Sequence, residues 1–227
     1  MSRVIVALDR TDKPIDWYKE FIQNTHEFVA GYKIGLPYLV KYGIKGFEEL
    51  SKFIDREKLW IIDFKLADIS YIMIKIVEAF IDMGFNAFIA HSFIGRQGSL
   101  NELKEYLSKK GSKLILIYTM SHQGAADILD KSIPLIEEVI ASIRPWGIVS
   151  PATRAVMIRR AKSFLKKIGI ESKILSPGIG YQGAVPGSAL KYGADYEIIG
   201  RLITYSSNPV SKIKEINNIH EKVIISE

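Results

Sequence analysis

The feature that most constrains the fold of this chain is a short, β-rich apolar segment that recurs roughly every 27 residues. Eight such segments are present: Val4–Leu8, Phe28–Ile34, Leu59–Lys65, Ala87–His91, Lys113–Thr119, Gly147–Ser150, Lys173–Ser176 and Tyr196–Gly200. Between them lie stretches with helical periodicity, such as Ile69–Phe80 and Pro151–Arg160, followed by glycines suited to a helix end, Gly84 and Gly169. Alternating helices and almost continuously apolar strands predict a parallel sheet covered by helices.

Eight strand–helix units in 227 residues fit a compact (β/α)8 barrel of the TIM type. A doubly wound open sheet is the alternative, because it also alternates strands and helices. The sequence contains no Pro/Ser-rich linker, low-complexity tract or shift in composition. We therefore expect residues 1–227 to form one barrel domain.

The composition excludes several classes of protein. With 48% hydrophobic and 25% charged residues, the chain is typical of a globular protein. Its apolar runs are far shorter than the roughly 20 residues that cross a bilayer, and its N-terminus lacks the pattern of a signal peptide. We therefore expect a cytoplasmic protein without a membrane partner. No cysteine is present and the four histidines match no metal-binding spacing, so we expect no metal ion.

The net charge of +6 is compatible with nucleic acid, with anionic metabolites or with solubility alone. The basic residues are spread over amphipathic stretches such as Arg159–Lys167. No helix-turn-helix or aromatic–basic pattern accompanies them. Nucleic acid is therefore not an expected partner.

Polar residues follow most of the expected strands. In a (β/α)8 barrel, the carboxyl ends of the strands form the rim that carries active sites. The residues at that rim would be Asp9, Lys33, Asp63, Lys65, His91, Thr119, Ser121, Pro177, Gly178, Gly200 and Arg201. Interior positions of such barrels are normally Val, Ile or Leu, so charges on three consecutive strands indicate catalysis.

The segment Asp63–Asp68 gives the sharpest signal. Side chains alternate along a strand, so Asp63 and Lys65 should share the barrel mouth with Lys33, while Phe64 should face the helices. Buried ion pairs are weak evidence for stability, and an uneven set of charges in a cleft indicates a candidate active site. A salt bridge that only closes the strand end is the structural alternative. Asp68 precedes an apolar helix, where an acidic residue is a good N-cap.

A glycine-rich segment, Ser176–Gly187, follows the seventh expected strand, and Gly200-Arg201 ends the eighth. Enzymes with (β/α)8 barrels often hold phosphate here, through backbone N–H groups and a guanidinium that grips two oxygens. A flexible connection with Arg201 in a surface ion pair is the alternative. Asp9 is either a turn former or an acceptor for sugar hydroxyls. His91 is expected to be a hydrogen-bonded rim residue, and Ser121 has no neighbouring base that would make it a nucleophile.

Several segments, in order, resemble the motifs of the orotidine 5′-phosphate decarboxylase family in its compact microbial form. They are Val6–Asp9, Gly31–Gly35, Asp63–Ile69, Met120–His122, Ser176–Gly180, Gln182-Gly183 and Ile199–Arg201. The resemblance covers essentially the whole chain. The D-x-K-x-x-D element is shared with 3-keto-L-gulonate 6-phosphate decarboxylases and hexulose-phosphate synthases, which carry an acidic metal ligand where this chain has Lys33. Lys33, Gln182 and Arg201 favour the orotidylate enzymes.

The resemblance implies conversion of orotidine 5′-phosphate to uridine 5′-phosphate, the last step of de novo UMP synthesis, without a metal or organic cofactor. It implies that Lys65 is the proton donor in a catalytic array with Asp63, Lys33 and Asp68. The implied substrate-binding residues are Asp9 and Lys33 at the ribose, Ser121 at the pyrimidine edge, Gln182 and Arg201 at the phosphate, and also Asp68, Ile69, Pro177, Gly178 and Gly200. It further implies a homodimer in which Asp68 reaches the neighbouring site.

One segment departs from the family pattern. After Asp68-Ile69 the family usually has Pro, a variable residue and Thr, whereas this chain has Ser70-Tyr71-Ile72. Two other functions stay open. In a Schiff-base aldolase, Lys65 or Lys33 would attack a carbonyl. A non-catalytic barrel that binds nucleotide phosphate is favoured if Ile72 reflects decay of the site.

Overall fold

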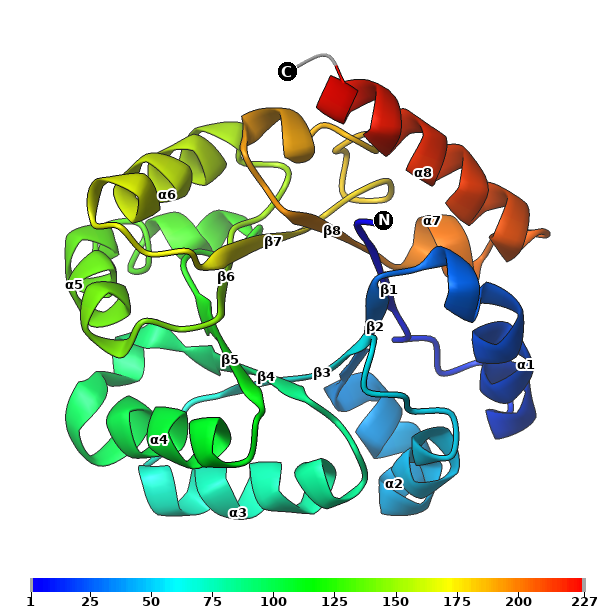
Figure 1. The fold of residues 1–227 in the computed structure, drawn as a ribbon, viewed down its shortest axis with the longest axis horizontal. Coiled ribbons are helices and arrows are strands. Elements are labelled where there is room, and N and C mark those ends of the chain that lie inside the picture. Colours follow the sequence, from blue (N-terminus) through cyan, green and yellow to red (C-terminus); the bar gives the residue numbers. More distant parts are fainter. Residues whose placement is uncertain (1, 226–227) are drawn as a thin grey trace.

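A computed structural model describes residues 2–225; Met1, Ser226 and Glu227 of the expected 1–227 domain lie outside the described residues. Eight parallel strands close into a barrel in sequence order (Figure 1). They are β1 Val4–Ala7, β2 Gly31–Gly35, β3 Leu59–Leu66, β4 Ala87–His91, β5 Lys113–Ile117, β6 Gly147–Val149, β7 Lys173–Pro177 and β8 Tyr196–Ile199. Because β1 pairs with β8 as well as with β2, the sheet is closed. The (β/α)8 prediction is confirmed and the open sheet is excluded.

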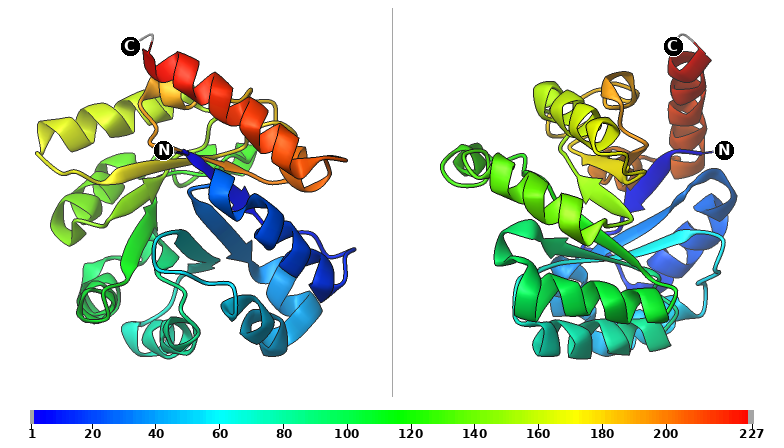
Figure 2. Two further views of the ribbon diagram at one scale, coloured as in Figure 1. Left: turned by 45° about the vertical axis from the view of Figure 1, so that its right-hand side comes forward. Right: turned by 60° about the vertical axis from the view of Figure 1, so that its left-hand side comes forward.

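The helices form an outer layer around the strands in every view (Figures 1 and 2). They are α1 Ile15–Thr25, α2 Leu36–Ser51, α3 Ser70–Asp82, α4 Asn101–Lys109, α5 Ile133–Ile143, α6 Ala155–Lys167, α7 Arg201–Thr204 and α8 Pro209–Ile225. Strict alternation fails at one unit: between β7 and β8 the chain forms a glycine-rich loop and a short 3-10 helix, Leu190–Tyr192. No helix within residues 2–225 has the length and apolarity needed to cross a bilayer.

Most strand boundaries follow the sequence pattern, and seven of the eight strands begin at the expected residue. The exception is β2, whose expected start at Phe28 is wrong. Residues His26–Phe28 form a 3-10 helix that continues α1, and the Phe28 carbonyl accepts a hydrogen bond from Asn217 of α8 at 2.8 Å. The apolar character of Phe28 therefore reflects packing at the end of a helix.

The two helices expected from periodicity are present. The expected start at Pro151 is wrong, because residues 151–154 form a turn in which the Arg154 N–H donates to the Pro151 carbonyl, and α6 begins at Ala155. Gly84 and Gly169 follow α3 and α6 with φ of 97° and 65°, so both predicted helix ends are confirmed.

Alternation of side chains along the strands divides the core into two parts. Outward residues such as Tyr32, Trp60 and Phe88 pack against the helices, and inward residues such as Ile61 and Ile89 fill the barrel. At the carboxyl end of the barrel the inward positions become polar. The apolar filling thus forms the floor of a site whose walls are the strand ends and the loops that follow them.

Candidate active site

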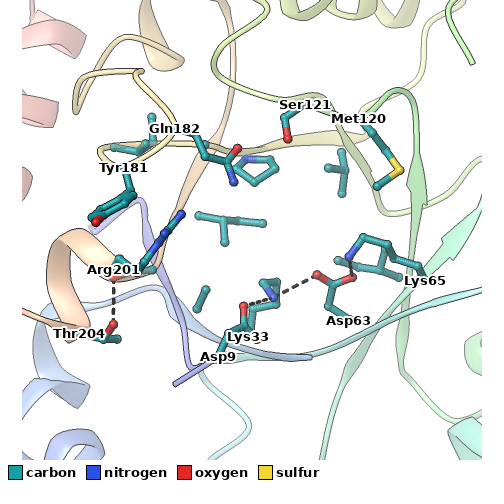
Figure 3. A pocket seen from close by; sticks show the side chains of 18 of the residues that line it. Asp9, Lys33, Asp63, Lys65, Met120, Ser121, Tyr181, Gln182, Arg201 and Thr204 are labelled. Carbon is teal, nitrogen blue, oxygen red and sulfur yellow. Dashed lines mark hydrogen bonds and ion pairs between the residues drawn. The ribbon is translucent and has the colours of Figure 1, made fainter. Parts of the chain in front are cut away.

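A cavity of about 550 Å³ opens at the carboxyl ends of the strands (Figure 3). Ala7, Ile89, Ile117, Val149 and Ile198 form its apolar part. Eleven of the residues expected from the sequence line it: Asp9, Lys33, Asp63, Lys65, Thr119, Ser121, Pro177, Gly178, Gln182, Gly200 and Arg201. These come from both ends of the chain and from its middle, so barrel closure brings them together.

Four charged side chains, from the loop after β1 and from β2 and β3, form a continuous chain of alternating sign. Lys33 Nζ lies 3.0 Å from Asp9 Oδ2 and 3.0 Å from Asp63 Oδ2. The other carboxylate oxygen of Asp63 accepts a hydrogen bond from Lys65 Nζ, also at 3.0 Å. The expected position of Lys65 beside Asp63 and facing the cavity is confirmed (Figure 3). The order is therefore Asp9, Lys33, Asp63, Lys65.

The middle of this chain is buried and its ends are open. The side chains of Lys33 and Asp63 are 9% and 10% exposed, against 39% for Asp9 and 42% for Lys65. Burial disfavours the charged form of Lys33, but attraction by Asp63 and Asp9 outweighs it and raises the pKa of Lys33. Burial likewise opposes ionisation of Asp63, but Lys33 and Lys65 hold its pKa below the usual value. Both groups therefore stay charged at neutral pH.

An irregularity in β3 directs the side chains of Asp63 and Lys65 towards the cavity. The pairing of β3 with β4 shifts between Ile62 and Leu66, and Lys65 has a positive φ of 47°. Such a backbone is uncommon for a residue with a side chain and costs roughly 1–2 kcal/mol. Phe64 faces outward and packs against Phe47 and Phe80, as expected. The bulge thus presents Asp63 and Lys65 to the cavity while Phe64 stays in the helical layer.

Asp9 is held by residues from the next strand. Its Oδ1 accepts the backbone N–H of Gly35 at 3.2 Å, and its Oδ2 accepts Lys33. A Cβ at position 35 would lie only 2.9 Å from Asp9 Oδ1, so glycine permits this approach. These partners are distant in sequence, so the carboxylate belongs to the site and does not form a local turn.

The glycine-rich loop lies across the cavity from Lys65. Figure 3 shows Tyr181, Gln182 and Arg201 together on that side. The Arg201 guanidinium lies over the Tyr181 ring, 3.8 Å from its centroid. The alternative expected from the sequence was a surface ion pair of Arg201. The far end of the loop is anchored by the fully buried Glu197 of β8, which accepts the N–H groups of Gly187 and Ala189.

A second ion pair supports the segment after β5. Arg154 donates to the carbonyl of Met120 at 3.2 Å and pairs with Asp130 through both guanidinium nitrogens. Thr119, which is fully buried, donates to Asp130 at 2.6 Å. These contacts fix Ser121 at the cavity wall, facing the opening in Figure 3.

The cavity of this chain is not lined by the expected rim residue His91, nor by Asp68 and Ile69, which the family resemblance implies as substrate-binding residues. The structural alternative in which Asp68 is an N-cap is excluded, because α3 begins at Ser70 after an Ile69 cap, and the Asp68 carboxylate accepts the N–H of the adjacent Ile69 at 2.7 Å. Both residues are exposed. The His91 ring lies against the Phe93 ring at a tilt of 43°, with the centroids 4.6 Å apart. Burial, together with the charge of Lys65, lowers the pKa of His91, which favours its neutral form at pH 7.

Sequence reasoning missed several residues of the cavity. Arg10, Met120, Ile179, Tyr181, Thr204 and Tyr205 all line it. Arg10 directly follows Asp9, and Tyr181 directly precedes Gln182, so adjacency to an expected residue could have indicated these two. Met120 and Ile179 lie within motifs that resemble the family, whereas Thr204 and Tyr205 had no signal of either kind. Within residues 2–225, no three His, Cys, Asp or Glu side chains gather as a metal site.

The fold and the cavity together define a (β/α)8 barrel with a rim site in which carboxylates alternate with lysine ammonium groups. A family model described as "Orotidine 5'-phosphate decarboxylase / HUMPS family" matches residues 2–216. The chain belongs to this family.

Curated relatives and solved structures agree with this assignment. The chain is 41% identical to an orotidine 5′-phosphate decarboxylase of Saccharolobus solfataricus over 99% of this chain and 94% of that protein. It is 39% identical to one of Aeropyrum pernix over 95% and 87%. The crystal structure of orotidine 5′-monophosphate decarboxylase from Sulfolobus solfataricus superposes with a TM-score of 0.84 at 38% identity, covering 99% of this chain and 100% of that one.

Proposed function

We propose that this protein decarboxylates orotidine 5′-phosphate to uridine 5′-phosphate, without a metal ion or organic cofactor. The names of its relatives support the reaction. The observation that carries the proposal is the chain of alternating charges from Asp9 to Lys65 in the cavity wall. By the family resemblance, the 3-keto-L-gulonate 6-phosphate decarboxylases and hexulose-phosphate synthases carry an acidic metal ligand at the position of Lys33. Here an ammonium group lies between the Asp9 and Asp63 carboxylates.

The reaction needs fixed charges near one carbon atom. When the bond to the carboxylate breaks, CO₂ leaves and the electron pair remains on the ring carbon, which then takes up a proton. Preorganised positive charge stabilises such a developing anion without the need for reorganisation. Lys65 Nζ, fixed by Asp63, supplies this charge and then the proton. Asp63 lies against the departing carboxylate and disfavours the ground state.

The phosphate end is assigned to Gln182 and Arg201. They lie across the cavity from Lys65 (Figure 3), which suits a substrate whose phosphate is remote from the reacting carbon. Binding energy from a remote group can order a loop and exclude water. Pro177, Gly178 and Gly200 provide backbone close to this end.

The ribose and the base are assigned to the remaining polar residues of the wall. Asp9 is the half-exposed end of the charge chain and Lys33 is its neighbour in that chain, so Asp9 Oδ2 and Lys33 Nζ can hydrogen-bond sugar hydroxyls. Ser121 offers a hydroxyl donor and acceptor to the pyrimidine edge. Asp63 and Lys65 then act at the reacting carbon, in the catalytic charge array that Lys33 and Asp68 complete.

We also propose a homodimer in which Asp68 and Ile69 of one subunit complete the site of the other. Large apolar side chains are exposed on the three consecutive units that follow β2, β3 and β4, the second of which carries Asp68: Leu36, Val40, Ile44, Ile69, Tyr71, Ile72 and Phe93. Exposed apolar side chains on neighbouring units are typical of an interaction surface. Ile72, which replaces the usual family threonine, extends this apolar surface.

The test is an absorbance assay of orotidine 5′-phosphate consumption, with and without a chelator, on the wild type and on Lys65→Ala. We expect chelator-resistant turnover that falls by at least a thousandfold in Lys65→Ala, because the charge and the proton are lost together. Binding of uridine 5′-phosphate should survive. Lys75→Ala, which removes an exposed lysine paired with Glu78 on α3, is the matched control. Near-normal turnover by Lys65→Ala would refute the mechanism, and trapping of an imine by borohydride would favour an aldolase.

A further inference from the structure

Arg10 is a cation of the cavity wall that the charge chain does not use. It follows Asp9 in the loop after β1, and it lines the cavity together with Tyr205. Its side chain is only 11% exposed. A long cationic side chain this well buried is normally held by several partners.

Every part of the Arg10 guanidinium is engaged. Its Nε donates to Asp12 at 2.8 Å, and its Nη2 pairs with the second oxygen of the same carboxylate. Its Nη1 donates to the backbone carbonyl of Thr204 at 2.6 Å. The guanidinium also lies over the Tyr205 ring, 3.9 Å from its centroid. Arg10 thus joins the loop after β1 to the segment after β8.

The bond to Thr204 reaches the helix that carries Arg201. Arg201 and Thr204 are the first and last residues of α7, which is only four residues long. The carbonyls at the end of a helix lack partners within the helix, so an outside donor there fixes the helix in place. A displacement of α7 would move Arg201, whose guanidinium lies at the opposite end of the same short element.

We propose that Arg10 is a positioning residue that holds α7 and thereby aims Arg201 at the phosphate of the substrate. This inference rests on the proposed function, because it assigns Arg201 to the phosphate. The contact with Asp12 orients the guanidinium, since its two parallel hydrogen bonds set the plane from which Nη1 reaches Thr204. Lysine cannot reproduce this geometry, because it offers a single nitrogen.

A double-mutant cycle distinguishes positioning from other roles. We would measure kcat/KM for orotidine 5′-phosphate, and Kd for uridine 5′-phosphate by calorimetry, in the wild type, Arg10→Ala, Arg201→Ala and the double variant. Arg10→Ala should reduce kcat/KM and weaken binding by about tenfold or more, since small misplacements of binding groups are costly. In the Arg201→Ala background the same change should cost less than about twofold. Arg10→Lys should behave like Arg10→Ala.

The controls separate the possible failures. Arg160→Ala removes an exposed arginine that also pairs twice with one carboxylate, that of Glu137, but lies on α6 away from the cavity, and it should leave both constants unchanged. Equal losses from Arg10→Ala in both backgrounds would overturn the proposal, because Arg10 would then act independently of Arg201. Absence of turnover in the wild type would instead refute the proposed function. The cycle would still be decided by Kd in that case.

Discussion

Replacement of Lys33 by methionine tests the charge chain most directly. The substitution keeps the volume of the side chain and removes the ammonium group that lies 3.0 Å from both Asp9 and Asp63. Removing one member of a buried ion pair typically costs about 3–5 kcal/mol, because the other charge stays buried without compensation. Asp63 retains Lys65, and Asp9 is partly hydrated, so we expect a value near the lower limit. The free energy of unfolding should therefore fall by about 3 kcal/mol at pH 7, equivalent to roughly 6–12 °C in Tm.

The pH dependence of this loss has a definite sign. The pKa of Lys33 is raised in the folded protein, so its contribution is fully present below the unfolded-state pKa and disappears as the pH rises through the folded-state value. The pKa of Asp63 is lowered in the wild type, so its contribution is present above the unfolded-state pKa and is lost on acidification. In Lys33→Met that carboxylate protonates more readily. The difference between the two proteins should be constant from about pH 6 to pH 10 and shrink towards pH 4.

Urea unfolding, followed by tryptophan fluorescence at pH 7 and pH 4.5, gives both quantities. Lys75→Met is the control, since the Lys75–Glu78 pair is exposed and should contribute less than about 1 kcal/mol. A loss below about 1 kcal/mol for Lys33→Met at pH 7, or a loss that does not change with pH, would refute the inference that the Lys33 ammonium compensates the charge of the buried Asp63 carboxylate.

Two further predictions concern the substrate and the subunits. Arg201→Ala should lower kcat/KM for the phosphorylated substrate by about a hundredfold or more, and kcat/KM for the dephosphorylated nucleoside by less than about twofold. Only the phosphorylated substrate offers charged oxygens to the guanidinium. Steady-state kinetics on both compounds check this, and equal losses would show that Arg201 does not bind the phosphate. Inactive Lys65→Ala and Asp68→Ala proteins, mixed and allowed to exchange subunits, should regain about a quarter of wild-type activity, because half of the dimers would be hybrids with one intact site. A mixture that stays inactive while native mass spectrometry shows hybrid dimers would refute a shared site.

The periodicity of the sequence was sufficient to predict the barrel. Inward and outward residues alternate along β3 with a single interruption, and that interruption coincides with Asp63 and Lys65. Period-two reasoning placed both side chains correctly, although it did not anticipate the positive φ of Lys65. The positional errors at Phe28 and Pro151 arose where an apolar residue packs outside the element that it seemed to begin.

The contacts that complete the site could not be predicted, because they join residues that are distant in sequence. The bond between Arg10 and Thr204 spans 194 positions. The residues next to Arg10 predict only a loop, and those next to Asp68 are also compatible with an N-cap. Neighbouring residues do not show the environment of either side chain in the barrel or how exposed it is. Composition also cannot indicate that the Tyr181 ring covers Arg201. These features depend on closure of the barrel.

The attachment of the glycine-rich loop at Glu197 limits how that segment can respond to a ligand. Its outer end is fastened to β8 through Gly187 and Ala189, and its inner part is cross-linked by the backbone bond from Gly180 to Ala184. The loop is thus already folded and held at both of these points. Ordering a free chain costs about 1–2 kcal/mol per residue, and a loop that is folded beforehand avoids most of that entropy loss. Under the proposed function, in which Gln182 and Arg201 bind the phosphate, more of the interaction energy of the phosphate would then remain for the reacting end of the cavity.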